Sequence, residues 1–423
     1  MFLTIIHLLS YLCLRAFGGI LSLLPYAFIQ RVGKKIGTLV YYLHRSFRKK
    51  ALSNVAIAYG EALSEKERKS IALESFQNLV IACLELFRLK RSRKNLSEII
   101  QIEGEEALLP FIEKKQGMIF LTCHQANWEI PFLAITAKYR GIGIGRPIKN
   151  RWLYRWLLSI REMNGGKIVM PRNAIRESLK ALKEGKFVGI VGDQAFPESP
   201  YAYPLFGTRA WTTNTPALLA YRTGCPLIAV STKRVGHRYV VRGSPPLWPD
   251  LALTREEALA DLMNRAMHYL EKSIQEAPGQ WMWQHDRWKQ QGIDHVKRPY
   301  RYGFILVIIP PDFSPYLPLF PLLKAIYPRS FLTFCIPEGC PFSLEGCEKR
   351  TYRSLSELYI RDFRYQFLID LSNTRSLRKH FLSLGVKSAV HLKKMQRRTR
   401  ESDLQKAILH TLVKKECLST VTI

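Results

Sequence analysis

The sequence lacks the paired cysteines that mark structural zinc sites and dithiol redox motifs. Its 423 residues include 8 cysteines, but none forms a Cys-x-x-Cys pair, and the spacing of Cys340 and Cys347 fits no standard zinc site. A complete Gly-x-Gly-x-x-Gly fingerprint is also missing from "GIGIGRP". We therefore expect reduced thiols in a reducing compartment, and neither a bound metal nor another cofactor.

Acidic residues are scarce relative to basic ones. Lys and Arg number 64 and Asp and Glu number 34, which leaves a formal net charge of +30. Such an excess favours an anionic partner: nucleic acid, an acidic membrane surface, an acidic carrier protein or a phosphorylated substrate. The basic tail "HLKKMQRRTR" supports a nucleic-acid-binding protein as one alternative. Because no nucleic-acid motif and no regular basic–aromatic interleaving accompany it, we expect no nucleic-acid partner.

The amino-terminal segment has no basic residues ahead of its apolar run, as a secretory signal would have. Residues 1–30 are mostly apolar, broken by His7 and Arg15, and basic residues follow at positions 31–35. We predict an uncleaved membrane-anchor helix over residues 1–30, which spans the bilayer or lies in its interface, because spanning takes about 20 apolar residues. A buried core helix is the alternative. The basic flank predicts that the rest of the chain stays cytoplasmic.

Apolar strand-like runs alternate with amphipathic helical stretches after residue 100. This alternation predicts an α/β fold with a mainly parallel sheet and flanking helices. The pattern breaks near residue 295 and restarts at "YGFILVIIP". We therefore divide the chain into the anchor, a main domain over residues 31–295, and a smaller carboxy-terminal α/β unit over residues 300–423.

The stretch "IFLTCHQANWEI" contains the first candidate for chemistry. His124 follows an apolar run, and Glu129 comes five residues later. Pro131 is tolerated only in the first turn of a helix, so the helix begins no earlier than about Asn127. His124 then lies in the preceding loop, and Glu129 can fold back toward it. Such a pair suits a general base with an orienting carboxylate. The alternative is an ordinary histidine beside a carboxylate that stabilises the helix start.

These residues resemble a known family. "HQANWE" resembles the His-x-x-x-x-Asp/Glu signature of glycerolipid acyltransferases, and most closely that of the lipid A late acyltransferases. "GRPIKN" resembles that family's Arg-Pro-x-x-Asn block, "GDQ" its aspartate block, and "APGQWMWQHDRWK" its closing segment. The blocks occur in the family's order over residues 1 to about 292. The resemblance implies a glycerolipid acyltransferase-like fold and an acyltransferase that acts in lipopolysaccharide biosynthesis.

The resemblance also implies roles for individual residues. His124 would remove the proton of the acceptor hydroxyl, and Glu129 would orient His124. Arg161 falls where the family carries a functional arginine, which would serve the oxyanion or a substrate phosphate. Asp193 would hold Arg161 or the loop around it. Two further candidates for substrate contact are Arg146 and Asn150.

The implied reaction transfers a fatty acyl group from acyl carrier protein to a hydroxyl of a lipid A precursor. The expected partners are these two substrates and an anionic membrane surface, at the cytoplasmic face of the inner membrane. A phospholipid-type lysophosphatidate acyltransferase is the alternative enzyme. The tryptophans of "RWLYRWLL" and "WMWQHDRW" lie either at the membrane interface or in the core. Residues 302–337 resemble the first strand–helix–strand of heptosyltransferase-type glycosyltransferases. Because half of such an enzyme is missing, we expect a docking module there.

Overall fold

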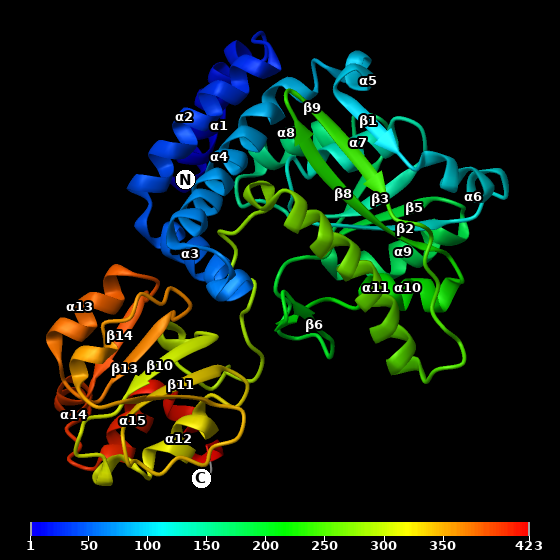
Figure 1. Ribbon diagram of the computed structural model, residues 1–423. Coiled ribbons are helices and arrows are strands. Elements are labelled where there is room, and N and C mark those ends of the chain that lie inside the picture. The colour runs from blue at the N-terminus through cyan, green and yellow to red at the C-terminus, as the bar shows by residue number, and fades with distance from the viewer. Residues whose placement is uncertain (1, 422–423) are drawn as a thin grey trace.

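The computed structural model describes residues 2–421 and is built around two sheets (Figure 1). The larger sheet has seven strands in the order β1-β9-β8-β2-β5-β3-β4, and only its β8–β9 pairing is antiparallel. The smaller sheet has five parallel strands in the order β12-β11-β10-β13-β14. The expected α/β fold with a mainly parallel sheet and a smaller carboxy-terminal α/β unit is confirmed.

The strands of the larger sheet are β1 (Ile100–Glu103), β2 (Met118–Thr122), β3 (Gly141–Ile144), β4 (Lys167–Val169), β5 (Phe187–Val191), β8 (Leu227–Val235) and β9 (Arg238–Gly243). The hairpin strands β6 (Ala202–Leu205) and β7 (Thr208–Trp211) pair separately. The helices around this sheet are α5 (Leu96–Ile99), α6 (Leu109–Glu113), α7 (Glu129–Thr136), α8 (Arg151–Arg161), α9 (Ala174–Lys183), α10 (Thr215–Thr223) and α11 (Arg255–Glu276).

The amino-terminal region consists of α1 (Phe2–Leu21), α2 (Tyr26–Leu43), α3 (Arg45–Tyr59) and α4 (Glu65–Leu89). The apolar stretch expected as one helix is divided ahead of α2, because Pro25 stands in an extended conformation at its N-cap. Helix α1 is long and apolar enough to cross a membrane by length and composition, and only 6% of its most apolar window is buried. This exposure is consistent with membrane anchoring and excludes the buried core helix.

Helix α4 is the long central support of this region. Ser64 and Glu67 form the capping box that their spacing predicts at its start. Its apolar composition also suits a membrane span, but half of its apolar window is buried in the protein. Helix α2 packs closely against it at Gly37, where an added Cβ would lie 2.4 Å from the backbone of Gln77. A side chain at position 37 would therefore force the two helices apart.

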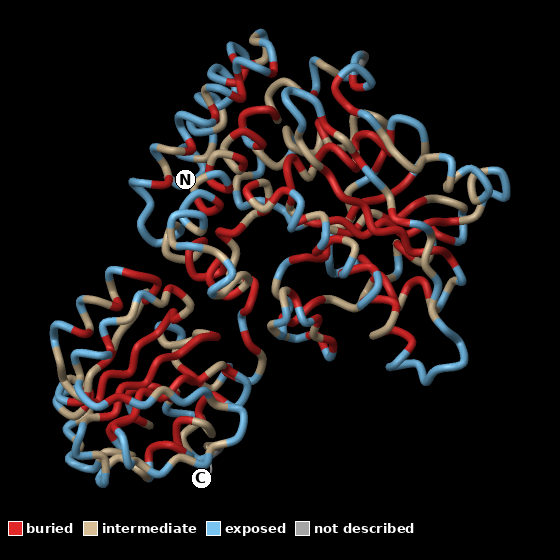
Figure 2. The backbone as a smooth tube through the Cα atoms, in the orientation of Figure 1, coloured by how far each residue is buried: buried red, intermediate tan, exposed pale blue. Residues whose placement is uncertain are grey.

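The core lies on both faces of the larger sheet, whose central strands are largely red in Figure 2. Every residue of β2 is buried. Met118 and Phe120 pack on the face that α7 covers, whereas Ile119 and Leu121 pack on the opposite face with α10 and α11. Alternate residues of a strand point to opposite faces, so a strand covered on both sides is apolar throughout.

The carboxy-terminal unit contains β10 (Phe304–Ile308), β11 (Phe331–Pro337), β12 (Glu348–Tyr352), β13 (Phe367–Asp370) and β14 (Ser388–His391), with α12 (Leu319–Ile326), α13 (Arg375–Ser383), α14 (Leu392–Thr399) and α15 (Leu404–Leu412). It docks against α3, where Lys49 Nζ donates to the Val386 carbonyl at 2.9 Å and Ser53 Oγ to the Arg364 carbonyl at 3.0 Å. Its apolar core already includes Ile293.

Candidate active site

The ring of His124 pairs with a carboxylate from a neighbouring strand. His124 lies two residues after β2, and Asp193 lies two residues after β5, its parallel neighbour. Because Thr122 and Val191 are register partners, both side chains emerge at the same edge of the sheet. His124 Nδ1 lies 2.7 Å from Asp193 Oδ1. With Nδ1 as the donor, Nε2 carries the lone pair that a general base needs.

Asp193 is held as an anion by three donors. Besides the His124 ring, its Oδ2 accepts from the backbone N–H of His124 at 2.8 Å and from Trp281 Nε1 at 2.7 Å. Burial by itself raises the pKa of this carboxyl, but His124 and these hydrogen bonds outweigh burial and lower the pKa to about 2. A buried carboxylate that stays charged can fix the imidazole tautomer and stabilise the imidazolium.

Glu129 and Arg161 form a second pair beside the first. Glu129 is the first residue of α7, and Arg161 is the last residue of α8. Arg161 donates from Nε to Glu129 Oε2 at 2.8 Å and from Nη2 to Oε1 at 2.5 Å. Burial opposes the charge of Arg161, but the Glu129 carboxylate prevails and raises its pKa. In this forked ion pair the side chain of Arg161 is 18% exposed and that of Glu129 is 9% exposed.

The expected pairings are therefore exchanged in the described contacts. We expected Glu129 to orient His124 and Asp193 to hold Arg161 or its loop, but Asp193 contacts His124 and Glu129 contacts Arg161. The reason is the parallel sheet, which brings the ends of β2 and β5 together. Glu129 instead emerges from the start of α7, which packs against α8.

His124, Glu129 and Arg161 line one cavity of about 580 Å³ at the carboxyl ends of the strands, and Asp193 is buried beneath His124. Away from His124 its walls are apolar and come from α7, β4, α9 and β5, chiefly Phe132, Ile135, Ile168, Ala174, Ile175 and Ile190. Gly143 and Gly189 leave space on the strands where side chains would otherwise project. The arrangement places a histidine and an arginine at the polar end of a pocket fit for a hydrocarbon chain.

The two weaker candidates differ in their placement. Arg146 is exposed and lines the cavity. Asn150 caps α8, since its Oδ1 accepts from the backbone N–H groups of Trp152 and Leu153 at 3.1 and 3.2 Å. Its Nδ2 donates to the His7 carbonyl of α1 at 2.8 Å. The structure thus gives Asn150 a role in joining α1 to α8 and does not bring it into the cavity.

Several residues near His124 and Asp193 were not among the site residues predicted from the sequence. Gln194 Nε2 lies 3.4 Å from His124 Nε2, and His285 Nε2 accepts the backbone N–H of Ala195 at 3.1 Å. Burial lowers the pKa of His285 to about 4, so it stays neutral. Trp281 is a partner of Asp193, and the tryptophans of "WMWQHDRW" are buried in the core. The position of "GDQ" directly after a strand is the signal that points to Gln194.

The loop that carries His124 is fixed by a buried polar network behind it. Ala126 has a positive φ of 50°, and its backbone N–H donates to the Gln280 carbonyl at 2.7 Å. Asn127 Nδ2 donates to Glu85 Oε2 at 2.9 Å, and Glu85 is fully buried in α4. These contacts fix the backbone of the loop that carries the histidine, and none of the residues that make them lines the cavity.

Comparisons with known proteins point in one direction. Residues 2–290 match the family model described as bacterial lipid A biosynthesis acyltransferase. The chain is 28% identical over 274 residues to the lipid A biosynthesis lauroyltransferase of Escherichia coli (strain K12), a match that covers 63% of this chain and 87% of that protein. It is 25% identical over 287 residues to the palmitoleoyltransferase of lipid A biosynthesis from the same strain, covering 64% and 88%. The five-stranded unit lies outside the matched residues.

Proposed function

Because the chain belongs to the bacterial lipid A biosynthesis acyltransferase family, we propose that it transfers a fatty acyl group from acyl carrier protein to a hydroxyl of a lipid A precursor. The observation that carries this proposal is the His124–Asp193 pair at the polar end of an apolar cavity. Histidine with an orienting carboxylate is suited to removing a hydroxyl proton, and the cavity is suited to an acyl chain.

The reaction proceeds in two steps at His124. Its Nε2 takes the proton of the acceptor hydroxyl while the hydroxyl oxygen attacks the thioester carbonyl carbon. Asp193, which accepts from Nδ1 at 2.7 Å, stabilises the imidazolium. The tetrahedral intermediate then collapses, the carbon–sulfur bond breaks, and the imidazolium returns its proton to the leaving thiolate. No cofactor is needed, because the thioester is already activated.

Arg161 serves the developing negative charge or a substrate phosphate, and Glu129 holds Arg161 in place. Two of the three guanidinium nitrogens of Arg161, Nε and Nη2, donate to Glu129. The third, Nη1, does not contact Glu129, and the Arg161 side chain lines the cavity. A preorganised donor near the reacting carbonyl is worth roughly 3–4 kcal/mol in transition-state stabilisation. Glu129 is thus a positioning residue that acts through the arginine.

The donor acyl chain occupies the apolar cavity, and the carrier protein docks at its mouth. Arg146 is exposed and lines the cavity, and Lys149 and Arg151 are exposed close after it in the chain. These cations attract an acidic carrier protein. Helix α1 anchors the chain to the inner membrane on its cytoplasmic side, since basic residues follow it. In this position the cavity lies close to a membrane-embedded acceptor.

The test uses membranes that carry the full-length protein. They receive a series of acyl carrier proteins with acyl chains of increasing length, together with a labelled lipid A precursor or, in parallel, lysophosphatidate. We expect label transfer to the lipid A precursor, its loss in His124→Ala, and full activity in His268→Ala, a control at an exposed histidine of α11. Transfer to lysophosphatidate alone contradicts the proposed acceptor, and activity of His124→Ala contradicts the proposed base.

A further inference from the structure

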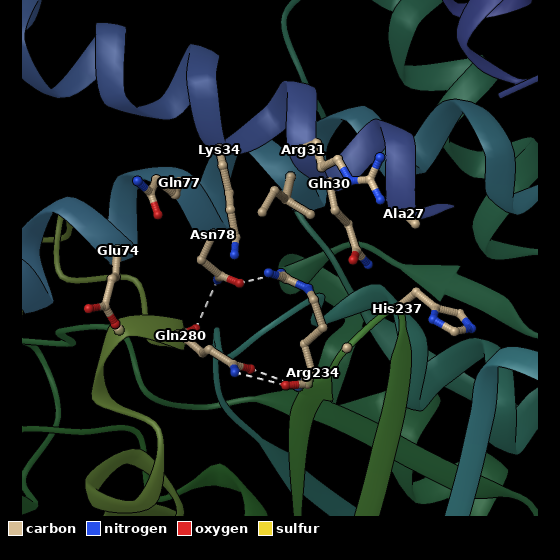
Figure 3. A pocket seen from close by; sticks show the side chains of 13 residues that line it. Ala27, Gln30, Arg31, Lys34, Glu74, Gln77, Asn78, Arg234, His237 and Gln280 are labelled. Atoms are coloured by element: carbon tan, nitrogen blue, oxygen red, sulfur yellow. Dashed lines mark hydrogen bonds between the residues drawn. The ribbon is translucent and has the colours of Figure 1, made fainter. Parts of the chain in front are cut away.

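A second cavity lies outside the site described above and shares none of its lining residues. Its volume is about 650 Å³, and it lies between α2, α4, the β8–β9 hairpin and the segment around Gln280 (Figure 3). We call it the basic recess, because three of its lining residues are cations: Arg31, Lys34 and Arg234. Glu74 is the one carboxylate among its lining residues.

Within residues 2–421, the three cations form no ion pair with a carboxylate. The guanidinium of Arg234 donates to two neutral oxygens, from Nε to the Tyr239 hydroxyl at 3.1 Å and from Nη2 to Asn78 Oδ1. Figure 3 shows the Lys34 side chain reaching down from α2 toward Asn78 and Arg234. Unpaired cations around one cavity favour an anion with several oxygens.

The floor of the basic recess is rigid. The side-chain amide of Gln280 clamps the backbone of Arg234, accepting its N–H at 2.7 Å and donating to its carbonyl at 3.0 Å. Asn78 Nδ2 donates to the carbonyls of Gln280 at 2.9 Å and Ala126 at 3.0 Å. Figure 3 draws the links among Asn78, Arg234 and Gln280 as dashed lines. A ligand would therefore meet donors that are already in place.

The same residues connect the basic recess to the catalytic loop. Gln30, which lines the recess, donates to Glu85 Oε1 at 2.9 Å, and the other oxygen of Glu85 accepts from Asn127. Asn78 likewise reaches the carbonyl of Ala126, two residues from His124. The loop that carries His124 thus contacts residues of the basic recess, while His124 itself lines the catalytic cavity.

Helix α2 places the basic recess beside an exposed apolar surface. Phe28 and Leu39 of this helix are 46% and 57% exposed, and α1 next to it is largely exposed along its apolar length. Arg31 and Lys34 are one turn apart and line the recess from the same helix. With α1 as the membrane anchor, a group bound there would lie near the lipid headgroups, where arginine and lysine meet phosphates.

We propose that the basic recess binds a phosphate carried by the acceptor lipid while the acceptor hydroxyl lies at His124. This inference rests on the proposed function and adds to it the part of the acceptor that is recognised. Bulk anionic phospholipids also carry phosphate groups, so the experiment must distinguish binding of the acceptor lipid from binding of bulk phospholipid.

The experiment is steady-state kinetics of the full-length protein in detergent, with the phosphorylated lipid A precursor and with the same precursor lacking a phosphate. Lys34→Ala and Arg31→Ala should each raise KM for the phosphorylated acceptor by about three- to fivefold, and the double variant by about tenfold or more. The value of kcat should stay within about twofold. Lys34→Arg should restore KM, since it keeps the charge. The matched control is Lys35→Ala, an exposed lysine of the same helix that does not line the recess.

A second arm isolates binding from turnover. In the inactive His124→Ala background, Lys34→Ala should weaken equilibrium binding of the phosphorylated acceptor by the same factor, and binding of the dephosphorylated acceptor should not change. The inference is overturned if Lys34→Ala leaves KM for the phosphorylated acceptor unchanged. If Lys34→Ala, but not Lys35→Ala, then lowers binding to phosphatidylglycerol vesicles, the recess holds bulk lipid instead. It is also overturned if both lysine variants change KM alike. Absence of turnover in the unmodified protein contradicts the proposed function itself.

Discussion

Replacing Asp193 by asparagine tests the pairing on which the mechanism depends. The carboxylate accepts three hydrogen bonds, from the His124 ring, the His124 backbone and Trp281. Its pKa is lowered from 3.8 to about 2, which corresponds to roughly 2 kcal/mol in favour of the charged form. An asparagine has one oxygen, so its NH₂ group must face at least one of these donors. We expect a loss of about 1–3 kcal/mol in the free energy of unfolding.

The kinetic loss should be larger than the loss of stability suggests. An amide NH₂ that faces Nδ1 favours the tautomer with the proton on Nε2, and that nitrogen can no longer accept a proton. We expect the single-turnover rate of Asp193→Asn to fall about 10²–10⁴-fold. Asp261→Asn, an exposed carboxylate of α11 paired with Arg265, is the control and should be unaffected.

Combining the variant with His124→Ala decides whether the two residues act as a unit. If they do, His124→Ala/Asp193→Asn is no slower than His124→Ala alone, because the base that Asp193 serves is already gone. Chemical denaturation of each variant separates loss of fold from loss of chemistry. Wild-type turnover in Asp193→Asn, or losses that multiply in the double variant, would refute the assignment of Asp193 as the partner of His124.

Arg161→Lys should lose kcat/KM almost as strongly as Arg161→Ala, because Glu129 is held by two nitrogens of one planar fork; near-normal kcat/KM in the lysine variant shows that only the charge matters. Gly189→Leu should shift the preference toward shorter acyl donors. Gly189→Ala should keep the original preference, since an added Cβ would lie 3.6 Å from its nearest neighbour, Phe132. The measurement is relative turnover with acyl carrier proteins that carry acyl chains of different length, and an unchanged preference in Gly189→Leu would mean that the acyl chain binds elsewhere. The pKa of His285 is lowered from 6.5 to about 4, so the unfolded chain binds the proton at a higher pH than the folded protein, and the free energy of unfolding falls by roughly 3 kcal/mol as the pH drops from 6.5 to 4. His285→Gln should remove this part of the pH dependence from denaturation curves measured between pH 4 and 7. An unchanged pH dependence contradicts the assignment. Deleting residues 300–423 should leave the chemical step intact but lower the melting temperature, because the ion pair of Lys387 with Asp286 at 2.8 Å and the docking of Ser53 are lost; abolished transfer by a truncated protein that still melts cooperatively shows that this unit completes the site.

Local features of the chain could be predicted from the sequence because their causes are local. The continuous apolar run "MIFLT" predicts a strand buried on both faces, and β2 is such a strand. The chemistry of Pro131 confines it to a first helical turn, and α7 begins two residues before it. The apolar amino terminus predicts an anchor, and α1 is exposed and apolar. The ordered motifs of residues 1 to about 292 predicted the family.

Which carboxylate pairs with His124 was decided by the tertiary structure. The sequence offers two carboxylates for His124, and the one five residues away is nearer in the chain than the one 69 residues away. Only the order of strands in the sheet, with β5 directly beside β2, brings Asp193 to the imidazole and leaves Glu129 to Arg161. The basic recess has the same origin, since its cations come from α2 and β8, about 200 residues apart. Residue spacing along a chain determines which side chains share a local element, whereas the packing of those elements determines which side chains meet.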